Sequence, residues 1–286
     1  MEIARTMTAG GPAVVIATGD RTSGHLATID GRTFEDLPDL LDAADGDASR
    51  IDAGATVDLD ALLPVVGRPR KIVCIGLNYR GHAAETNVPL PPAPVVFPKW
   101  DNALAGPSDD VPLPDESSEV DWEAELAFVF GKRCRRMAAA DAASVVFGFT
   151  AANDLSMRDY QKATSQWAPG KTWDRGTAVG PVLVDTAQIG SVAPDLAIRG
   201  KRNGELVQDS RTNDLIFGVP ELVAFLTSFM TMEPGDIVLT GTPAGVGFTR
   251  TPPQFLEPGD EFEVEIEGIG SLRNRFVAER DWVGSA

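Results

Sequence analysis

Short apolar runs separated by turns rich in Gly, Pro, Asn and Asp recur along most of the chain. Runs of this kind, with β-branched and aromatic residues, predict strands. After residue 68 we expect strands at 72–75, 94–97, 125–130, 180–184, 196–199, 236–240 and 261–266. The clearest helical segments in this part are 138–143 and 220–230. Because strands far outnumber crossover helices, the pattern indicates an α+β fold with a barrel-like, strand-rich sheet and argues against a doubly wound sheet.

The first 68 residues show a different pattern, which predicts a small leading α+β domain. Apolar runs at 13–17 and 25–29 predict two short strands, and the leucines between residues 33 and 50 predict a helix followed by a loop. Gly and Pro at 67–70 precede a strongly apolar run, which is typical of a boundary. We therefore expect a leading domain at 1–68 and a main domain at 69–286.

The charge balance narrows the classes of partner. The 286 residues include 25 basic and 42 acidic side chains, so the net charge is −17. This excess repels nucleic acid and anionic membranes, so neither is an expected partner. An anionic substrate remains compatible, because a bound cation and a few local basic side chains can reverse the sign within a site. The two cysteines, Cys74 and Cys134, form no disulfide framework, and no signal or membrane segment stands out, so we expect a cytoplasmic protein.

Two glutamates in the segment 120–130 are the first candidates for chemistry. Alternate side chains of a strand share a face, so Glu123 and Glu125 are expected together on one face, which continues with apolar residues. Two ionised carboxylates on a buried face repel each other unless a cation neutralises them. Hard oxygen donors suit Mg²⁺, Mn²⁺ or Ca²⁺ better than zinc. A solvated strand edge that carries two acids is the alternative interpretation.

A second acidic candidate, Asp154, ends an apolar run. Its carboxylate can serve as a third metal ligand at a junction between a strand and a helix, or as an ordinary helix N-cap. Arg158 follows one helical turn later, where its guanidinium could bind a substrate carboxylate.

Histidine is scarce, which draws attention to His82. Glu85 follows three residues later, so the two side chains meet if this segment is helical, and the pair could activate water. An exposed helix start with an incidental acid is the alternative. The other histidine, His25, lies in the leading segment among no other chemical candidates, and we expect it to be a surface or core residue.

Two glycine-containing segments invite a phosphate-binding interpretation. The segment 170–172 reads Gly-Lys-Thr, but it lacks the first glycine and the preceding strand of a P-loop. The segment 241–247 follows a predicted strand, and its amides could cradle an anionic group, yet its glycine spacing disfavours a nucleotide. A plain tight turn is the alternative for this second segment.

The order of these motifs resembles the fumarylacetoacetate hydrolase family over residues 65–280. The matching segments are Gly-Leu-Asn-Tyr-Arg-Gly-His-Ala-Ala-Glu at 76–85, Asp-Trp-Glu-Ala-Glu-Leu at 121–126, Asn-Asp-Leu-Ser-Met-Arg-Asp-Tyr-Gln at 153–161, Gly-Lys-Thr-Trp-Asp at 170–174, Asn-Gly-Glu at 203–205 with Gln208, and the Pro-Gly-Asp and Thr-Gly-Thr-Pro turns at 234–236, 240–243 and 258–260. Two departures stand out: at 171–176 the family's Lys-Ser-Phe-Asp-Thr-Phe reads Lys-Thr-Trp-Asp-Arg-Gly, and the segment 164–167, Thr-Ser-Gln-Trp, looks specialised. We expect both segments to line the pocket and to bear on the identity of the substrate.

The resemblance implies a set of roles. It implies a divalent metal, Mg²⁺ or Mn²⁺ with Ca²⁺ as a further candidate, and a homodimer that acts on a small 2-oxo acid. The implied metal ligands are Glu123, Glu125 and Asp154; the implied catalytic residues are His82, Glu85 and Lys171; the implied substrate contacts are Arg158, Gln161 and Thr242.

Three reaction types fit one such site. The leading expectation is hydrolytic cleavage of a C–C bond in a small 2,4-dioxo acid of the acylpyruvate or fumarylpyruvate type, through a metal-stabilised enolate. The same enolate also serves a 2-hydroxyhepta-2,4-diene-1,7-dioate isomerase or an oxaloacetate decarboxylase. A remote alternative is a non-catalytic protein that binds Ca²⁺ for stability, which would not need His82, Glu85 and Lys171.

Overall fold

The structure, a computed structural model, describes residues 1–282. Its main element is a 12-stranded sheet, and the strand order is β4-β3-β2-β1-β14-β12-β11-β17-β6-β7, with β5 paired to β3 and β8 paired to β14. In chain order these strands are β1 (Glu2–Thr8), β2 (Gly11–Ala17), β3 (Ser23–Ile29), β4 (Arg32–Thr33), β5 (Asp52–Asp58), β6 (Ile72–Gly76), β7 (Val95–Lys99), β8 (Leu104–Ala105), β11 (Ala124–Phe130), β12 (Val146–Asp154), β14 (Thr177–Asp185) and β17 (Ile237–Leu239).

A second sheet of five strands packs against the first. Its order is β16-β15-β18-β19-β9, with bounds β9 (Asp110–Leu113), β15 (Ala197–Arg202), β16 (Glu205–Arg211), β18 (Glu261–Ile266) and β19 (Gly270–Ala278). A two-stranded ribbon joins β10 (Val120–Asp121) to β13 (Ser156–Met157). The α-helices are α1 (Leu37–Ala44), α2 (Arg80–Glu85), α3 (Arg158–Lys162), α4 (Thr186–Ile189) and α5 (Val219–Phe229).

The predicted α+β, strand-rich class is confirmed. In the part of the chain that the structure describes, the large sheet has two free ends, at β4 and β7, so the barrel-like roll that we expected is not closed. The expected helical segment at 138–143 is present as a 3-10 helix, Ala139–Ser144. Among residues 1–282, no helix is long and apolar enough to cross a membrane.

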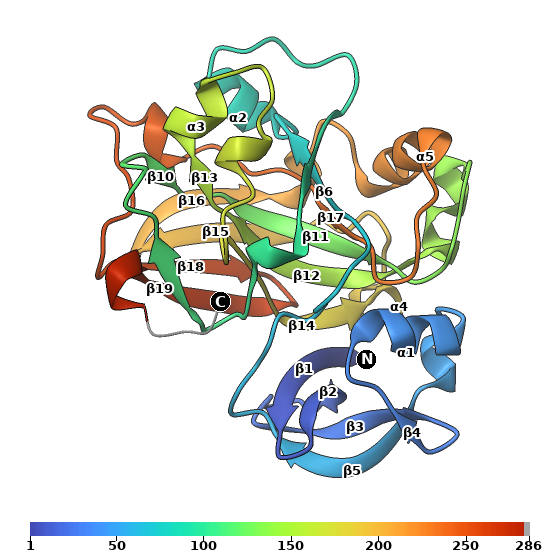
Figure 1. Ribbon diagram of the computed structural model, residues 1–286. Coiled ribbons are helices and arrows are strands. Elements are labelled where there is room, and N and C mark those ends of the chain that lie inside the picture. Colours follow the sequence, from blue (N-terminus) through green and yellow to red (C-terminus); the bar gives the residue numbers. More distant parts are fainter. Residues whose placement is uncertain (283–286) are drawn as a thin grey trace.

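The leading segment joins the main sheet directly. Figure 1 shows β1–β5 and α1 gathered at one end of the molecule. β1 nevertheless pairs with β14, with Ile3 opposite Leu183, so the hydrogen-bonded ladder crosses the expected domain boundary. The predicted strands at 13–17 and 25–29 and the helix after residue 33 are present as β2, β3 and α1. The division at residue 68 stays a prediction.

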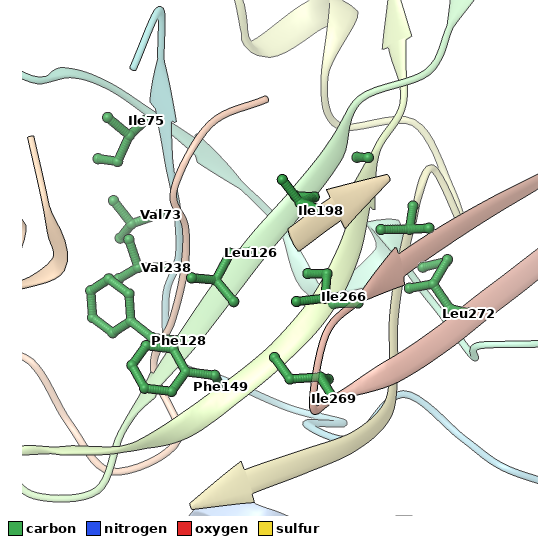
Figure 2. Packing of buried hydrophobic residues seen from close by; sticks show 14 of the residues in the cluster. Val73, Ile75, Leu126, Phe128, Phe149, Ile198, Val238, Ile266, Ile269 and Leu272 are labelled. Atoms are coloured by element: carbon green, nitrogen blue, oxygen red, sulfur yellow. The ribbon is translucent and has the colours of Figure 1, made fainter. Parts of the chain in front are cut away.

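The two central strands, β11 and β12, are buried along their whole length. On one face of β11, Leu126 and Phe128 pack toward the second sheet, where they belong to the same apolar cluster as Ile198 and Ile266. Figure 2 shows this layer between the two sheets. Ala127 and Val129, on the other face, belong to a second cluster that includes the buried leucines of α1. Burial on both faces explains why these strands read as continuous apolar runs.

The core between the sheets generates a stability prediction. Phe128→Ala removes a fully buried ring, so we expect the free energy of unfolding to fall by about 3–5 kcal/mol. Leu206→Ala on β16, whose side chain is 49% exposed, is the matched control and should change it by less than about 0.5 kcal/mol. Guanidinium denaturation monitored by tryptophan fluorescence measures both. Equal losses for the two variants would contradict the assignment of this layer as the core.

Candidate metal centre and active site

Three carboxylates converge where β11 and β12 lie side by side. Glu125 is in β11, Glu123 comes just before that strand, and Asp154 is the last residue of β12. Antiparallel pairing of Ala124 with Asn153 brings these ends together. One ligand oxygen from each acid lies within 4.8 Å of the others, and all three side chains are buried. The helix N-cap interpretation of Asp154 is wrong, because α3 begins at Arg158 and its N-cap residue is Met157.

Three cations neutralise most of this negative charge. Lys171 Nζ donates to Glu123 Oε2 at 2.7 Å and to Asp154 Oδ2 at 2.8 Å. Lys99 Nζ lies 2.6 Å from Asp154 Oδ1, and its own side chain is fully buried. Arg158 lies 2.8 Å from Glu123 Oε1. Although burial opposes ionisation, Lys171 and Arg158 hold the pKa of Glu123 below its usual value, so this carboxylate is charged at neutral pH.

Glu125 has a different environment. It accepts a hydrogen bond from the backbone N–H of Gly241 at 2.7 Å, and within residues 1–282 it makes no ion pair with a basic side chain. Burial, together with the nearby charges of Asp154 and Glu123, raises the pKa of Glu125 well above its usual value. An ionised Glu125 therefore lacks a counter-charge that the protein itself provides. A divalent cation held by Glu123, Glu125 and Asp154 would supply it, and an all-carboxylate donor set fits Mg²⁺, Mn²⁺ or Ca²⁺.

The predicted histidine–glutamate pair is present on α2. His82 Nδ1 lies 3.2 Å from Glu85 Oε2, and the imidazole is buried. Burial would raise the pKa of Glu85, but hydrogen bonds from His82, Thr249 and Gly245 outweigh it and lower the pKa. An ionised carboxylate only accepts hydrogen bonds, so Nδ1 carries the hydrogen and Nε2 can take up a proton. The alternative of an exposed helix start is wrong.

The glycine-rich segment 241–248 binds anions that belong to the protein itself. The Gly241 amide donates to Glu125, the Gly245 amide to Glu85 Oε1 at 3.0 Å, and the Gly247 amide to Asp121 Oδ1 at 2.6 Å. Gly245 has a φ of +104°, and a Cβ there would lie 2.0 Å from the Val207 carbonyl oxygen. The expected cradle for an anion therefore exists as an anchor for three carboxylates of the site.

A cavity of about 410 Å³ opens beside the carboxylates. Its polar part includes His82, Glu123, Glu125, Lys171 and Arg158. Its apolar part includes Ile75, Leu77, Val88, Phe97 and Trp167. The cavity is large enough for a small organic acid. The imidazole of His82 and the carboxylates of Glu123 and Glu125 all line it, so one bound molecule could contact all three.

Gly76 shapes the apolar part of the cavity. The Trp167 ring packs edge to face on Phe97, with ring centroids 5.5 Å apart. A Cβ at residue 76 would lie 2.2 Å from that indole, so the absence of a side chain there makes room for Trp167.

The three expected substrate contacts line this cavity, but each is already bonded to protein groups. Arg158 is bound by Asp121 as well as Glu123, and its Nη1 donates to Gln161 Oε1 at 2.9 Å. The Thr242 hydroxyl accepts from Gln208 and donates to the Ala124 carbonyl oxygen. Their roles toward a substrate stay predictions.

Sequence reasoning missed several residues of the site. Lys99 ends an apolar strand, and a lysine in that position is a signal that could have been followed. Asp121 was noted as part of a motif, and the structure shows that it bonds Arg158 and the Gly247 amide. Nothing in the local spacing points to Lys162 or Phe248, which also line the cavity. His25, as expected, lies outside the site, near Thr56.

Comparisons with known proteins agree with this geometry. A family model described as fumarylacetoacetate (FAA) hydrolase, C-terminal, matches residues 71–277. A mitochondrial oxaloacetate tautomerase of Xenopus laevis is 47% identical over 219 residues, which cover 76% of this chain and 68% of that protein. A mitochondrial oxaloacetate tautomerase of Homo sapiens is 46% identical over 217 residues, covering 75% of this chain and 69% of that protein. Because these relatives are mitochondrial, the expected cytoplasmic location is not confirmed.

Solved structures are similar over nearly the whole chain. A putative HpcE protein from Mycobacterium smegmatis has a TM-score of 0.86 at 34% identity and covers 97% of this chain and 99% of its own. A fumarylacetoacetate hydrolase from Exiguobacterium antarcticum has a TM-score of 0.85 at 29% identity, with coverages of 97% and 99%. A 2-hydroxyhepta-2,4-diene-1,7-dioate isomerase from Mycobacterium marinum has a TM-score of 0.76 at 32% identity, with coverages of 98% and 99%.

The environment of Glu125 predicts that its replacement raises the stability of the metal-free protein and lowers its affinity for Mg²⁺. Its pKa is raised in the folded protein, so below about pH 4.5 the protonated side chain carries no penalty, and the penalty grows as the pH rises and the folded group ionises. In EDTA at pH 8, Glu125→Gln should therefore be more stable than the native protein, and the gain should shrink at pH 5. The same variant should bind Mg²⁺ about 100-fold more weakly, or worse. Even the mutation of a residue that only holds a metal ligand in place typically lowers metal affinity 10–100-fold.

Denaturation at the two pH values and calorimetric Mg²⁺ titration measure these effects. Glu257→Gln, at an exposed carboxylate, is the control and should change neither quantity. A Glu125→Gln variant that binds Mg²⁺ as tightly as the native protein would remove Glu125 from the metal centre.

Proposed function

The chain belongs to the fumarylacetoacetate hydrolase family of enzymes, and from this premise we propose that it catalyses metal-dependent enolisation of a small 2-oxo dicarboxylic acid, with tautomerisation of oxaloacetate as the leading reaction. The observation that carries the proposal is one cavity lined both by His82, the partner of Glu85, and by Glu123 and Glu125, two members of the carboxylate triad. The choice of reaction within the family rests on the relatives at 46–47% identity, which are named as oxaloacetate tautomerases.

A divalent ion bound by Glu123, Glu125 and Asp154 would supply a Lewis acid that stabilises the negative charge of an enolate. His82 Nε2 would accept a proton from the carbon next to the keto group and return it to oxygen, so no atom is gained or lost. Ionised Glu85 would stabilise the imidazolium formed between these two transfers. Glu85 itself is held by the Gly245 amide and the Thr249 hydroxyl, which keeps the imidazole oriented.

Lys171 and Lys99 would orient the carboxylates of the proposed metal ligands. Their ammonium groups bond both oxygens of Asp154, which fixes the rotation of that carboxylate. Lys171 also bonds Glu123, so it links two of the three proposed metal ligands. The apolar wall around Phe97 and Trp167 would limit the access of water to the enolate.

Hydrolytic C–C cleavage of an acylpyruvate, which the sequence favours, is the second candidate. The apolar part of the cavity supports it, because an acyl chain could pack against Trp167 and Phe97. In that reaction His82 would activate a water molecule rather than move a substrate proton. Decarboxylation of oxaloacetate would use the same enolate. A homodimer, expected from the family resemblance, stays a prediction.

The direct test is turnover of oxaloacetate (followed as enol absorbance), acetylpyruvate, fumarylpyruvate and a hydroxyheptadienedioate with Mg²⁺ or Mn²⁺, each with and without EDTA. We expect chelator-sensitive ketonisation of enol-oxaloacetate to be the fastest reaction. Preferred cleavage of an acylpyruvate would replace the leading proposal with the second one. Tight metal binding without turnover of any member would favour a structural Ca²⁺ site.

His82 separates an enzyme from a protein that only binds a metal. His82→Asn keeps a group that can donate to Glu85 but cannot take up a proton, so kcat should fall by about 10²–10⁴-fold. Mg²⁺ affinity should stay within about twofold, because His82 is not one of the three converging carboxylates. His25→Asn, outside the cavity, is the matched control and should retain full activity. Unchanged turnover in His82→Asn would exclude the proposed base.

A further inference from the structure

The basic side chains around the carboxylate triad are already paired with protein acids. Lys171 bonds Glu123 and Asp154, and Lys99 bonds Asp154. Arg158 bonds Asp121 and Glu123. Each of these cations therefore has its charge compensated before any substrate enters. A substrate with a second negative charge would need a cation that is still available.

Lys162 is such a cation. It is the last residue of α3, it is exposed, and it lines the same cavity as His82 and Lys171. Within residues 1–282, it is the one lysine or arginine of the cavity wall that makes no ion pair with an acid. Its ammonium lies 4.4 Å from the centroid of the Phe248 ring. A contact of this kind orients a lysine while leaving its N–H donors able to bind an anion.

Phe248 is itself held in place. Its backbone N–H donates to Asp121 Oδ2 at 3.2 Å, and the neighbouring Gly247 amide donates to Oδ1 of the same buried carboxylate. The Arg158 guanidinium also lies 4.4 Å from the Phe248 centroid. The ring is thus a support fixed to β10, two residues before Glu123, and Lys162 is oriented by the site rather than by solvent alone.

We propose that Lys162 is a specificity-determining residue that binds the second carboxylate of a dicarboxylic 2-oxo acid. This inference rests on the proposed function and names the class of substrate within it. The wall at Trp167 and Phe97 offers a carboxylate no positive charge and at most the neutral indole N–H of Trp167, so an anion placed there would be costly. Within the described residues, the Lys162 end is therefore the part of the cavity that suits the second charge.

If the substrate carries an apolar acyl group in place of the second carboxylate, we expect Lys162 to have no effect on its binding. Such a substrate would pack against Trp167 and Phe97, and Lys162 would stay solvated. The two cases differ in how Lys162 distinguishes ligands of equal length, which can be measured without any turnover.

The test is calorimetric titration of the Mg²⁺-loaded protein with malate and with 2-hydroxybutyrate, two unreactive four-carbon acids that differ by a terminal carboxylate or methyl group. Lys162→Met should weaken malate binding roughly 3- to 10-fold and leave 2-hydroxybutyrate unchanged, the effect expected for a partly exposed, charge-assisted pair. Lys162→Arg keeps the charge and should bind malate nearly as the native protein does. Lys132→Met makes the same charge change outside the cavity, at a lysine that pairs with Asp45, and should alter the binding of neither ligand.

Equal weakening of both ligands, or native malate affinity in Lys162→Met, would overturn the assignment, as would a native protein with no preference for malate. Oxaloacetate kinetics keep the two proposals apart. If the native protein turns over oxaloacetate and Lys162→Met leaves KM unchanged, the role of Lys162 fails while the proposed function stands. If oxaloacetate is not turned over but Lys162→Met selectively weakens malate binding, the proposed reaction fails and the carboxylate site stands.

Discussion

Burial of charge is the constraint on which the rest of this molecule depends. Four carboxylates, those of Asp121, Glu123, Glu125 and Asp154, are buried together, and three cations face them. Ionised groups taken out of water destabilise a fold unless they are paired and hydrogen-bonded. Among the described residues, Glu125 is the member without an ion-pair partner, and its pKa is raised well above its usual value beside a cavity. The protein thus retains an electrostatic cost that a bound cation would relieve.

The sheet provides the rigidity that this arrangement needs. β11 and β12 are buried on both faces and hydrogen-bonded along their length, so the positions of Glu123, Glu125 and Asp154 are fixed by backbone pairing rather than by loops. The second sheet packs against the β11 face opposite to the carboxylates (Figure 2). Precise sites are more often built on such elements than on mobile segments. The candidate metal ligands thus lie at the adjacent ends of β11 and β12, two strands whose middle residues belong to the hydrophobic core.

Strand periodicity was sufficient to place Glu123 and Glu125 on one face, since alternation depends only on backbone geometry. It was not sufficient for β12, because a strand buried on both faces shows no alternation and Asp154 then resembles a helix cap. The family resemblance, and not local spacing, brought Lys171 and His82 into one site. The structure then showed that Arg158, expected to be free for a substrate, is bound by Asp121 and Glu123. Partners distant in sequence, such as Lys99 and Asp154, cannot be paired from a single chain.

The glycine-rich segment 241–248 restricts which mutations can alter this site. Through the backbone amides of residues 241, 245 and 247 it holds Glu125 of the carboxylate triad, Glu85 beside His82, and Asp121, which pairs with Arg158. A shift of this one loop would move all three carboxylates at once, so we expect the proposed cation binding and the proposed proton transfer to be thermodynamically coupled through main-chain atoms. Apart from proline, no side-chain replacement removes a main-chain donor, which makes these anchors resistant to most mutations. We therefore expect substrate range to diverge more easily at Lys162 and Trp167, cavity residues that lie outside this glycine-rich segment.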